Sequence, residues 1–505
     1  MSVFQPLPLG QRIPGSPHSV ACSLPTMQDV VGYEEGRPET TRQIASGYPR
    51  FVVHAHTRQL AALLGRRPEL AGRSLWLVTS PAMAAALADH LGRGAPAHAA
   101  PFAAEGVDGV AHADSPALNA RSKVFLQHIG GFLSSRAAED HLVRLGALPA
   151  AAPEQLFAGD AAAEVRRVLR PAFAGAQDRD LLLAPSGMNA LYASFRAVNA
   201  LQAPRGRTKW LQLGWLYLDS IALMRKFTAD PARDYLRLGD VTDLAALARI
   251  FREHGPRLAG LIVEAPTNPL IQTPDIAAVA ALAREHGALL VLDPAISSPF
   301  NVDLLPHADL VTQSLTKYAA HEGDVIAGAI VVNPGRPDAD GLRRHAAAFL
   351  EPLHGRDVAR LAAQIGAAPG VVARINAGTL QVAAFLEAHP AVRQVWWALQ
   401  PATRANYLKI ARTPESVGAM ISFTLRSPLT LERFYDRVRL PKGPSFGMTT
   451  TLISPFIYLA HYDLVTSEAG RAELAAHGLD PQLLRLSVGT EPVDDIIATL
   501  AEALA

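Results

Sequence analysis

The sequence predicts an α/β protein with a mostly parallel sheet, followed by a smaller α+β domain. From about residue 157, short continuous apolar runs alternate with amphipathic helical patterns, and after a long helical stretch at 338–389 the pattern changes to separated short strands. Continuous apolar strands between helices are typical of a parallel sheet covered on both faces. At ~150 residues per domain, the 505 residues are enough for two or three domains.

The alternating region can be followed element by element. We expect strands at 181–184, 210–213, 258–264 and 288–293, and helices at 159–170, from Met188 onward, at 243–254 and at 276–286. In the last of these helices, Thr273-Pro274-Asp275 offers a capping hydroxyl and a proline at the first helical position, and Gly287 a stop. Runs at 308–312 and 324–332 continue the same sheet.

The two ends of the chain have different patterns. Strands at 392–397, 419–425 and 484–488 and a helix at 493–504 predict the smaller domain. About 30 residues at the start are rich in Pro, Gly and Ser and are expected to run extended over a surface or a neighbouring subunit. A buried strand is expected at 74–79, and the Ala/Gly/Pro-rich stretch 93–120 is taken as a boundary. The predicted division is an N-terminal extension (1–120), a large domain (121–375) and a small domain (376–505).

Composition excludes several classes of function. The chain has 47 Lys+Arg against 46 Asp+Glu, so its net charge of +1 gives no electrostatic footprint for nucleic acid or an anionic membrane. The single cysteine, Cys22, excludes an internal disulfide framework, and neither a membrane span nor a secretory signal is recognised, so a cytoplasmic setting is expected. His54 and His56 stand without a cysteine or carboxylate cluster in the sequence, and no metal site is expected there.

Three strand ends carry residues that suggest chemistry. Strand 181–184 is followed by Pro185-Ser186-Gly187-Met188 at the start of a helix, where backbone N–H groups can bind an anion. Strand 288–293 ends in Asp293, and the strand at 308–312 runs into Ser314-Leu315-Thr316-Lys317, which holds one of only six lysines. Each feature has an ordinary explanation: a helix cap, a turn cap and an outward-facing lysine.

Together, the three features are what a pyridoxal phosphate site requires. A lysine that loses hydration acquires a lowered pKa and can bind the cofactor covalently. An acid keeps the pyridine nitrogen protonated, and the helix start with nearby hydroxyls holds the phosphate.

Several longer stretches resemble the Cys/Met-metabolism family of pyridoxal phosphate enzymes, which includes cystathionine γ-synthases, cystathionine lyases and O-acylhomoserine sulfhydrylases. They are LIVEAPTNPLIQTPDIAAVAALAREHGALLVLD, HADLVTQSLTKYAAHEGDVIAGAIVVNP and LLRLSVGTEPVDDIIATLAEAL. The stretches PLGQRIPGSPHSVACSLPTMQDVVGYEEG, GYPRFVVH and KVFLQHIGGFLSSRAAEDHL resemble the long cystathionine γ-synthases of fungi. The resemblance implies fold type I, with a large cofactor-binding domain and a smaller C-terminal domain.

The resemblance also implies roles for individual residues. Lys317 would bind the cofactor and move protons, Asp293 would pair with its pyridine nitrogen, and Tyr217 would stack on its ring. Asn268 would lie near the phenolic oxygen, and Arg485, supported by Ser445, would clamp the substrate α-carboxylate. The phosphate would be held by Ser186, Gly187, Met188, Ser314 and Thr316.

In this family an arginine crosses the dimer interface to the partner's phosphate, which implies a homodimer or homotetramer with shared active sites. Two arginines qualify. Many family members have a Tyr-Ser-Arg sequence shortly before the glycine–methionine motif. Arg136, in Leu133-Ser134-Ser135-Arg136, has this position but no tyrosine before it. Tyr48-Pro49-Arg50 has the tyrosine but lies far upstream. We favour Arg136.

The implied reaction is γ-replacement on an O-acylhomoserine by a thiol such as cysteine, giving cystathionine. Two departures leave the substrate open: Ala295 stands where the family has a hydroxyl under the ring, and Thr450 lies where it has an acid near the entrance. Alternatives are an O-acylhomoserine sulfhydrylase, a cystathionine or methionine lyase, γ-substitution with a non-cysteine nucleophile in specialised metabolism, and a catalytically inactive paralogue. The last is disfavoured because Lys317, Asp293 and Arg485 are all present.

Overall fold

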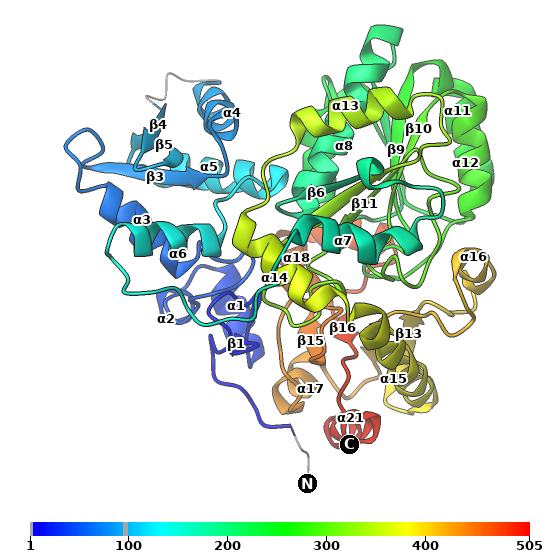
Figure 1. The fold of residues 1–505 in the computed structure, drawn as a ribbon. Helices are drawn as coiled ribbons and strands as arrows, with labels where there is room; N and C mark the ends of the chain where they lie inside the picture. Colours follow the sequence, from blue (N-terminus) through cyan, green and yellow to red (C-terminus); the bar gives the residue numbers. More distant parts are fainter. Residues whose placement is uncertain (1–3, 94–98) are drawn as a thin grey trace.

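The computed structural model describes residues 4–93 and 99–505 (Figure 1). Its centre is a seven-stranded sheet with the strand order β6-β12-β11-β10-β9-β7-β8. The strands are β6 (Leu181–Ala184), β7 (Lys209–Leu213), β8 (Tyr235–Leu238), β9 (Leu258–Glu264), β10 (Leu289–Asp293), β11 (Leu310–Ser314) and β12 (Gly328–Val332). All neighbours pair in parallel except β12, which runs antiparallel to both β11 and β6. The predicted mostly parallel α/β sheet is confirmed.

The sheet is covered on both faces, as its apolar strands predict. Leu261 and Val263 of β9 belong to one hydrophobic core, and Ile262 between them belongs to another. The first core receives side chains from α7 (Ala161–Leu169), α11 (Leu244–His254) and α12 (Ile276–Glu285). The second receives them from α8 (Gly187–Gln202), α9 (Leu218–Phe227) and α13 (Ala339–Phe349). Both faces of the sheet are therefore covered by apolar side chains, and we expect ligands to bind at the strand ends.

Some local predictions need correction. Helix α12 begins at Ile276, so Pro274 is not its first residue and Thr273 lies two residues before the N-cap. The N-cap is Asp275, which accepts a hydrogen bond from the Ala278 N–H at 3.2 Å. The helical stretch 338–389 is three helices: α13, α14 (Gly355–Ile365) and α15 (Ala368–Ala388). Strand β8 was not predicted.

The smaller C-terminal part contains a four-stranded antiparallel sheet with the order β13-β14-β16-β15. Its strands are β13 (Val392–Trp397), β14 (Met420–Leu425), β15 (Leu452–Pro455) and β16 (Leu484–Ser487). Its helices are α15, α16 (Arg404–Ile410), α17 (Leu431–Arg437), α18 (Phe456–Ala460), α19 (Tyr462–Thr466), α20 (Glu468–Ala476) and α21 (Val493–Leu504). Strands β13, β14 and β16 and helix α21 agree with the predicted α+β domain.

The N-terminal region is more structured than its composition suggests. It holds a three-stranded antiparallel sheet, ordered β3-β5-β4, which Figure 1 shows beside the central sheet. The elements are β1 (Arg12–Ile13), β2 (Ala21–Cys22), α1 (Met27–Glu34), α2 (Pro38–Thr41), α3 (Ala55–Leu64), β3 (Arg73–Val78), α4 (Pro81–Gly92), β4 (Ala100–Ala104), β5 (Val107–Ala113), α5 (Pro116–Ile129) and α6 (Ser135–Arg144).

This region changes two predictions. The stretch 93–120, read as aperiodic, includes the β4–β5 hairpin, because the strands of a small half-exposed sheet need few large apolar residues. The proposed boundary at 120/121 falls inside α5, and that at 375/376 falls inside α15.

The arm at the start of the chain packs on its own chain, since Ile13 and Val20 share a core with Met448 and Leu452. None of the helices in the described ranges is both long and apolar enough to cross a membrane.

Candidate active site

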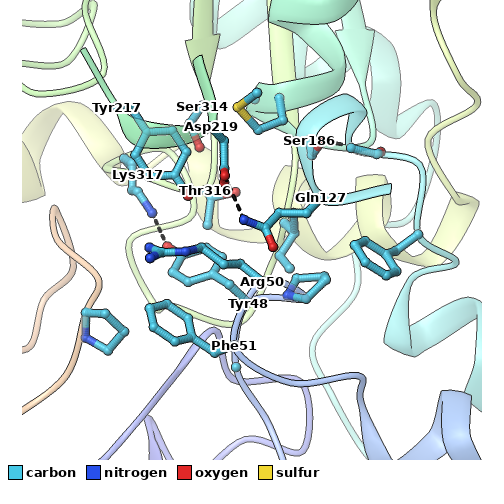
Figure 2. Close-up of a pocket in the computed structure, with 18 of the residues that line it drawn as sticks. Tyr48, Arg50, Phe51, Gln127, Ser186, Tyr217, Asp219, Ser314, Thr316 and Lys317 are labelled. Carbon is cyan, nitrogen blue, oxygen red and sulfur yellow. Dashed lines mark hydrogen bonds between the residues drawn. The ribbon is translucent and has the colours of Figure 1, made fainter. Parts of the chain in front are cut away.

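A cavity of about 240 Å³ lies at one edge of the seven-stranded sheet. Its wall includes Ser186, Glu264, Asp293 and Lys317, which end or follow β6, β9, β10 and β11 respectively. The carboxyl ends of strands that run in one direction meet at the same edge of an open sheet, and ligands bind there. The structure thus brings the three predicted features to one place, and Figure 2 shows Ser186 and Lys317 on this wall.

Lys317 lies in the turn after β11 and faces the cavity. Its Nζ donates a hydrogen bond to the Tyr48 hydroxyl and lies 4.0 Å from the centroid of the Tyr48 ring. Burial, together with the nearby charge of Arg485, lowers the pKa of Lys317 well below its usual range. The lysine is therefore suited to be a neutral amine, the form that acts as nucleophile and base.

Two carboxyl groups lie side by side at the strand ends. Asp293 of β10 is directly opposite Glu264 of β9 in the sheet register. Burial raises the pKa of Asp293 to about 7, and burial and the neighbouring Asp293 raise that of Glu264 well above its usual value. Asp293 accepts a 2.7 Å hydrogen bond from the Ala295 N–H. Glu264 was not predicted, although its place at the end of a buried strand, like that of Asp293, was visible in the sequence.

The predicted anion cradle is formed at the start of α8. Ser186 caps this helix by accepting a 3.0 Å hydrogen bond from the Asn189 N–H. The amides of Gly187 and Met188 come earlier and have no acceptor within the helix. A Cβ on Gly187 would lie 2.8 Å from the Cβ of Ser314, so only glycine allows the helix start to approach β11 so closely. Thr316 is held by both backbone groups of Ala327, which leaves its hydroxyl less available than that of Ser314.

Arg485 projects from β16 into the same cavity and is buried. Its Nη1 donates to Asn268 Oδ1 at 3.2 Å and its Nη2 to the Pro444 carbonyl at 3.0 Å. The guanidinium also lies 4.4 Å from the centroid of the Phe456 ring. The remaining N–H groups can donate to a carboxylate in the cavity. Ser445 contacts Tyr48 rather than Arg485, with 2.7 Å between the two hydroxyl oxygens.

Tyr217 forms another part of the wall, near Lys317 in Figure 2. Its backbone N–H donates to Glu264 Oε1 at 2.6 Å, which ties the tyrosine to the carboxyl pair. Asp219, two residues later, is buried and accepts a 2.7 Å hydrogen bond from Gln127. Burial raises the pKa of Asp219. The pairs Asp219–Gln127 and Tyr48–Lys317 were not predicted, because their members lie 92 and 269 residues apart in the chain.

The two candidate arginines differ clearly in their contacts. Arg136 is 1% exposed, and its guanidinium forms ion pairs with Glu154, Asp324 and Asp357 of its own chain. These carboxylates and the Asp324 carbonyl engage all three of its nitrogens, so the structure does not present Arg136 to a phosphate. Both arginines line the cavity, but among the described residues the Arg50 guanidinium donates a hydrogen bond only to the Leu459 carbonyl, at 2.8 Å. On contacts alone, Arg50 is the better candidate.

The groups in the cavity match the chemistry of pyridoxal phosphate. Glu264 Oε2 is buried without a hydrogen-bond partner, and a Cβ at Gly187 would fill the narrow gap between the cradle and Ser314. A lysine suited to be neutral, an acid able to hold a proton and unpaired helix-start amides match the aldehyde, the pyridine nitrogen and the phosphate of that cofactor. Fold and site together define a pyridoxal-phosphate-dependent enzyme of fold type I.

Comparison with known proteins identifies the family. Residues 174–505 match the family described as Cys/Met metabolism PLP-dependent enzyme. The chain belongs to this family, as its motifs indicated, and it uses pyridoxal phosphate.

Curated relatives extend over the whole chain. The chain is 42% identical over 492 residues to an L-2-amino-4-chloropent-4-enoate dechlorinase/desaturase of Streptantibioticus cattleyicolor, covering 97% of each chain. It is 27% identical to the cystathionine gamma-synthase of Neurospora crassa, covering 99% of this chain and 98% of the relative. The predicted likeness to fungal cystathionine γ-synthases is confirmed, and the N-terminal region takes part in it.

Solved structures support the fold. The cystathionine gamma synthase of Xanthomonas oryzae pv. oryzae in complex with cystathionine matches with a TM-score of 0.58 at 24% identity, covering 68% of this chain and 86% of that one. The cystathionine gamma-lyase of Lactobacillus plantarum matches with a TM-score of 0.55 at 22% identity, covering 67% of this chain and 83% of that one. The chain therefore shares the fold of these two enzymes.

Proposed function

We propose that this enzyme removes a γ-substituent from a small amino acid, and that the substituent is a halide such as the chlorine of 2-amino-4-chloropent-4-enoate. The observation that carries the proposal is the apolar wall around Lys317. Phe446, Phe456, Ile296 and Ile326 line the cavity with the lysine, and the Phe446 ring centroid is 4.8 Å from its Nζ. The 42% identity to a dechlorinase over nearly the full length supports the same substrate class.

The charged groups of the cavity favour one amino-acid substrate over two. Arg485 can hold one α-carboxylate, whereas Asp219 is already bonded to Gln127 and Arg50 is a candidate for the cofactor phosphate. A second zwitterionic substrate such as cysteine needs a partner for its ammonium group, and Thr450 stands where family members carry an acid. Elimination of the γ-substituent uses no second substrate, so it requires no further partner for an ammonium group.

Each residue would have a defined task. When bound, pyridoxal phosphate supplies an electron sink for negative charge at the substrate α-carbon. Asp293 would hold the proton on the ring nitrogen, Tyr217 would pack on the ring, and Arg485 would orient the carboxylate. The phosphate would be bound by the amides of Gly187 and Met188, the Ser314 hydroxyl and Arg50.

Removal of the halide is redox-neutral. The C–Cl bond breaks with its electron pair going to chloride, one proton is lost from the carbon chain, and the new unsaturation follows from this loss of HCl without an oxidant. Lys317 Nζ would accept and move the proton. The Tyr48 hydroxyl, which is hydrogen-bonded to Lys317 Nζ, can exchange a proton with Nζ and would shield that proton from solvent.

A second candidate is γ-replacement on an O-acylhomoserine by a thiol such as cysteine, giving cystathionine. The full-length likeness to the Neurospora crassa cystathionine gamma-synthase favours it. Sulfhydrylase and lyase reactions use the same set of residues. A homodimer or homotetramer with shared sites remains a prediction for every one of these reactions.

Substrate assays separate the candidates. The holoenzyme is given 2-amino-4-chloropent-4-enoate alone, or O-acetyl- or O-succinylhomoserine with cysteine, while chloride release and product masses are recorded. We expect chloride release and a product lighter by HCl, absent in Lys317→Ala and kept in Lys409→Ala, whose exposed lysine pairs with Asp275. Cystathionine formation without chloride release would contradict the proposal and establish the second candidate.

A further inference from the structure

Three histidines from separate segments meet at one end of the cavity. His18 comes from the N-terminal arm, His54 caps α3, and His56 lies in its first turn. One ring nitrogen from each can be chosen so that all three lie within 4.8 Å of one another. The ring centroids of His54 and His56 are 4.9 Å apart, and each is about 6 Å from that of His18. The sequence suggested no metal site here because it did not show that His18 joins the pair.

Each histidine has an outer partner for one ring nitrogen. His18 Nε2 is 3.2 Å from Glu139 Oε2, and His54 Nε2 is 2.9 Å from the Pro17 carbonyl. A hydrogen bond to the backbone of Ser135 involves the ring of His56. Metal-binding histidines commonly donate their second N–H to a carboxylate or carbonyl in this way, which fixes the tautomer and leaves the other nitrogen as the ligand.

The remaining nitrogens are in the form that binds metals. His56 Nδ1 is buried without a hydrogen-bond partner. His54 Nδ1 accepts only a 3.2 Å hydrogen bond from the His56 N–H, and His18 Nδ1 faces the Ser135 hydroxyl, which can rotate away. Burial lowers the pKa of His18 to about 3 and that of His54 to about 4, so both rings are neutral at pH 7. Neutral imidazole is the ligand form.

The surroundings carry an excess of negative charge. Arg136, Arg356 and Arg360 form a connected set of ion pairs with six carboxylates: Glu139, Asp140, Glu154, Glu322, Asp324 and Asp357. Three cations against six anions leave a formal charge of −3 in this set, and Arg12 and Arg58, whose charges also act on His54, reduce the excess to −1. Glu139, which contacts His18, is 2% exposed.

We propose that His18, His54 and His56 bind one divalent transition-metal ion of the Zn²⁺ type, with water as the fourth ligand. Zn–N bonds of about 2.0–2.1 Å place tetrahedral ligand atoms about 3.4 Å apart, so the three rings must close in by roughly 1 Å. His18 and His54 border the cavity, which has space for the water. The ion would link the N-terminal arm to the start of α3 and, through Ser135 and Glu139, to α6.

Metal binding is tested on the holoenzyme. Protein treated with a chelator and desalted is titrated with Zn²⁺ or Co²⁺, and bound metal is measured by inductively coupled plasma mass spectrometry. We compare wild type with His56→Ala and with His254→Ala, a matched control on α11 whose side chain is 33% exposed. We expect one equivalent per chain in wild type and in the control, and at least tenfold weaker binding in His56→Ala.

Two measurements on wild type make the test independent of the variant's folding. Bound Co²⁺ should show the intense visible absorption of a tetrahedral nitrogen site, and Zn²⁺ should raise the Tm by several degrees in wild type and not in His56→Ala. Less than a tenth of an equivalent bound to wild type would overturn the proposal, as would equal affinities of the two variants. Cofactor absorbance is followed throughout, so loss of pyridoxal phosphate is recognised separately.

Discussion

The carboxylate clamp is the part of the site whose energetic contribution can be worked out most directly. Asn268 and Pro444 each accept one N–H of Arg485, which fixes the guanidinium plane and leaves further N–H groups toward the cavity. Two charge-assisted hydrogen bonds to the substrate carboxylate at about 1.5–3 kcal/mol each amount to about 3–6 kcal/mol. Arg485→Ala should therefore lower kcat/KM by roughly 10²–10⁴-fold.

The assay must distinguish loss of the clamp from loss of the cofactor. We expect the visible absorbance of bound pyridoxal phosphate to be unchanged in Arg485→Ala, with steady-state rates measured on the substrate that the wild type accepts. Arg485→Lys keeps the charge but loses the planar fork, so its kcat/KM should lie between those of wild type and Arg485→Ala. A kcat/KM within threefold of wild type, or loss of cofactor with normal kcat/KM per bound cofactor, would refute the role.

Three other predictions follow from the geometry of the site. Folding raises the pKa of Asp293 to about 7. The ionised carboxylate therefore lowers the stability of the cofactor-free protein above that pH. This loss of stability disappears as the pH falls to the pKa of the unfolded chain, about 3.9. Asp293→Asn should thus raise the Tm of cofactor-free protein by a few degrees at pH 8, with a gain that shrinks toward pH 4; an equal gain at both pH values would speak against it. Arg136→Ala leaves buried Asp357 without its cation and removes one of the two arginines that pair with Glu154 and with Asp324. It should cost about 3–5 kcal/mol of unfolding free energy in urea titrations, against about 0–1 kcal/mol for Arg205→Ala at the exposed pair with Asp338. Equal losses would mean that the buried pairs are unimportant. Gly187→Ala puts a Cβ 2.8 Å from Ser314 and should weaken cofactor binding at least tenfold in equilibrium titrations. Gly370→Ala, with nothing within 4 Å of its added Cβ, should leave cofactor binding unchanged. Unchanged cofactor affinity in Gly187→Ala would mean that the helix start at Gly187 does not bind the phosphate.

The elements predicted best from the sequence are those that local patterns determine. The strand at 258–264 and the helix at 493–504 were predicted with their observed bounds, because a fully buried strand is continuously apolar and an amphipathic helix repeats its apolar face. The β4–β5 hairpin was missed because β4 is mostly exposed and because several buried positions of β5 hold Gly109, Ala111 and His112 rather than large apolar residues. The ends of the buried strands were predicted well enough to place Asp293 and Lys317 in one site.

What the sequence could not show are contacts between distant segments. Tyr48 and Lys317 are 269 residues apart and hydrogen-bonded. Arg136 was favoured for the phosphate by its place in the order of motifs, but its partners Asp324 and Asp357 come from segments that only the folded chain brings to it. His18 joins His54 and His56 for the same reason.

The most direct test of the central claim asks which lysine carries the cofactor. Purified holoenzyme is treated with borohydride, which fixes bound pyridoxal phosphate to its lysine, and the modified peptide is identified by mass spectrometry. We expect loss of the visible absorbance and one label, on Lys317, with no label on Lys317→Ala. Modification of Lys209 or Lys226 in place of Lys317 would contradict the site described above.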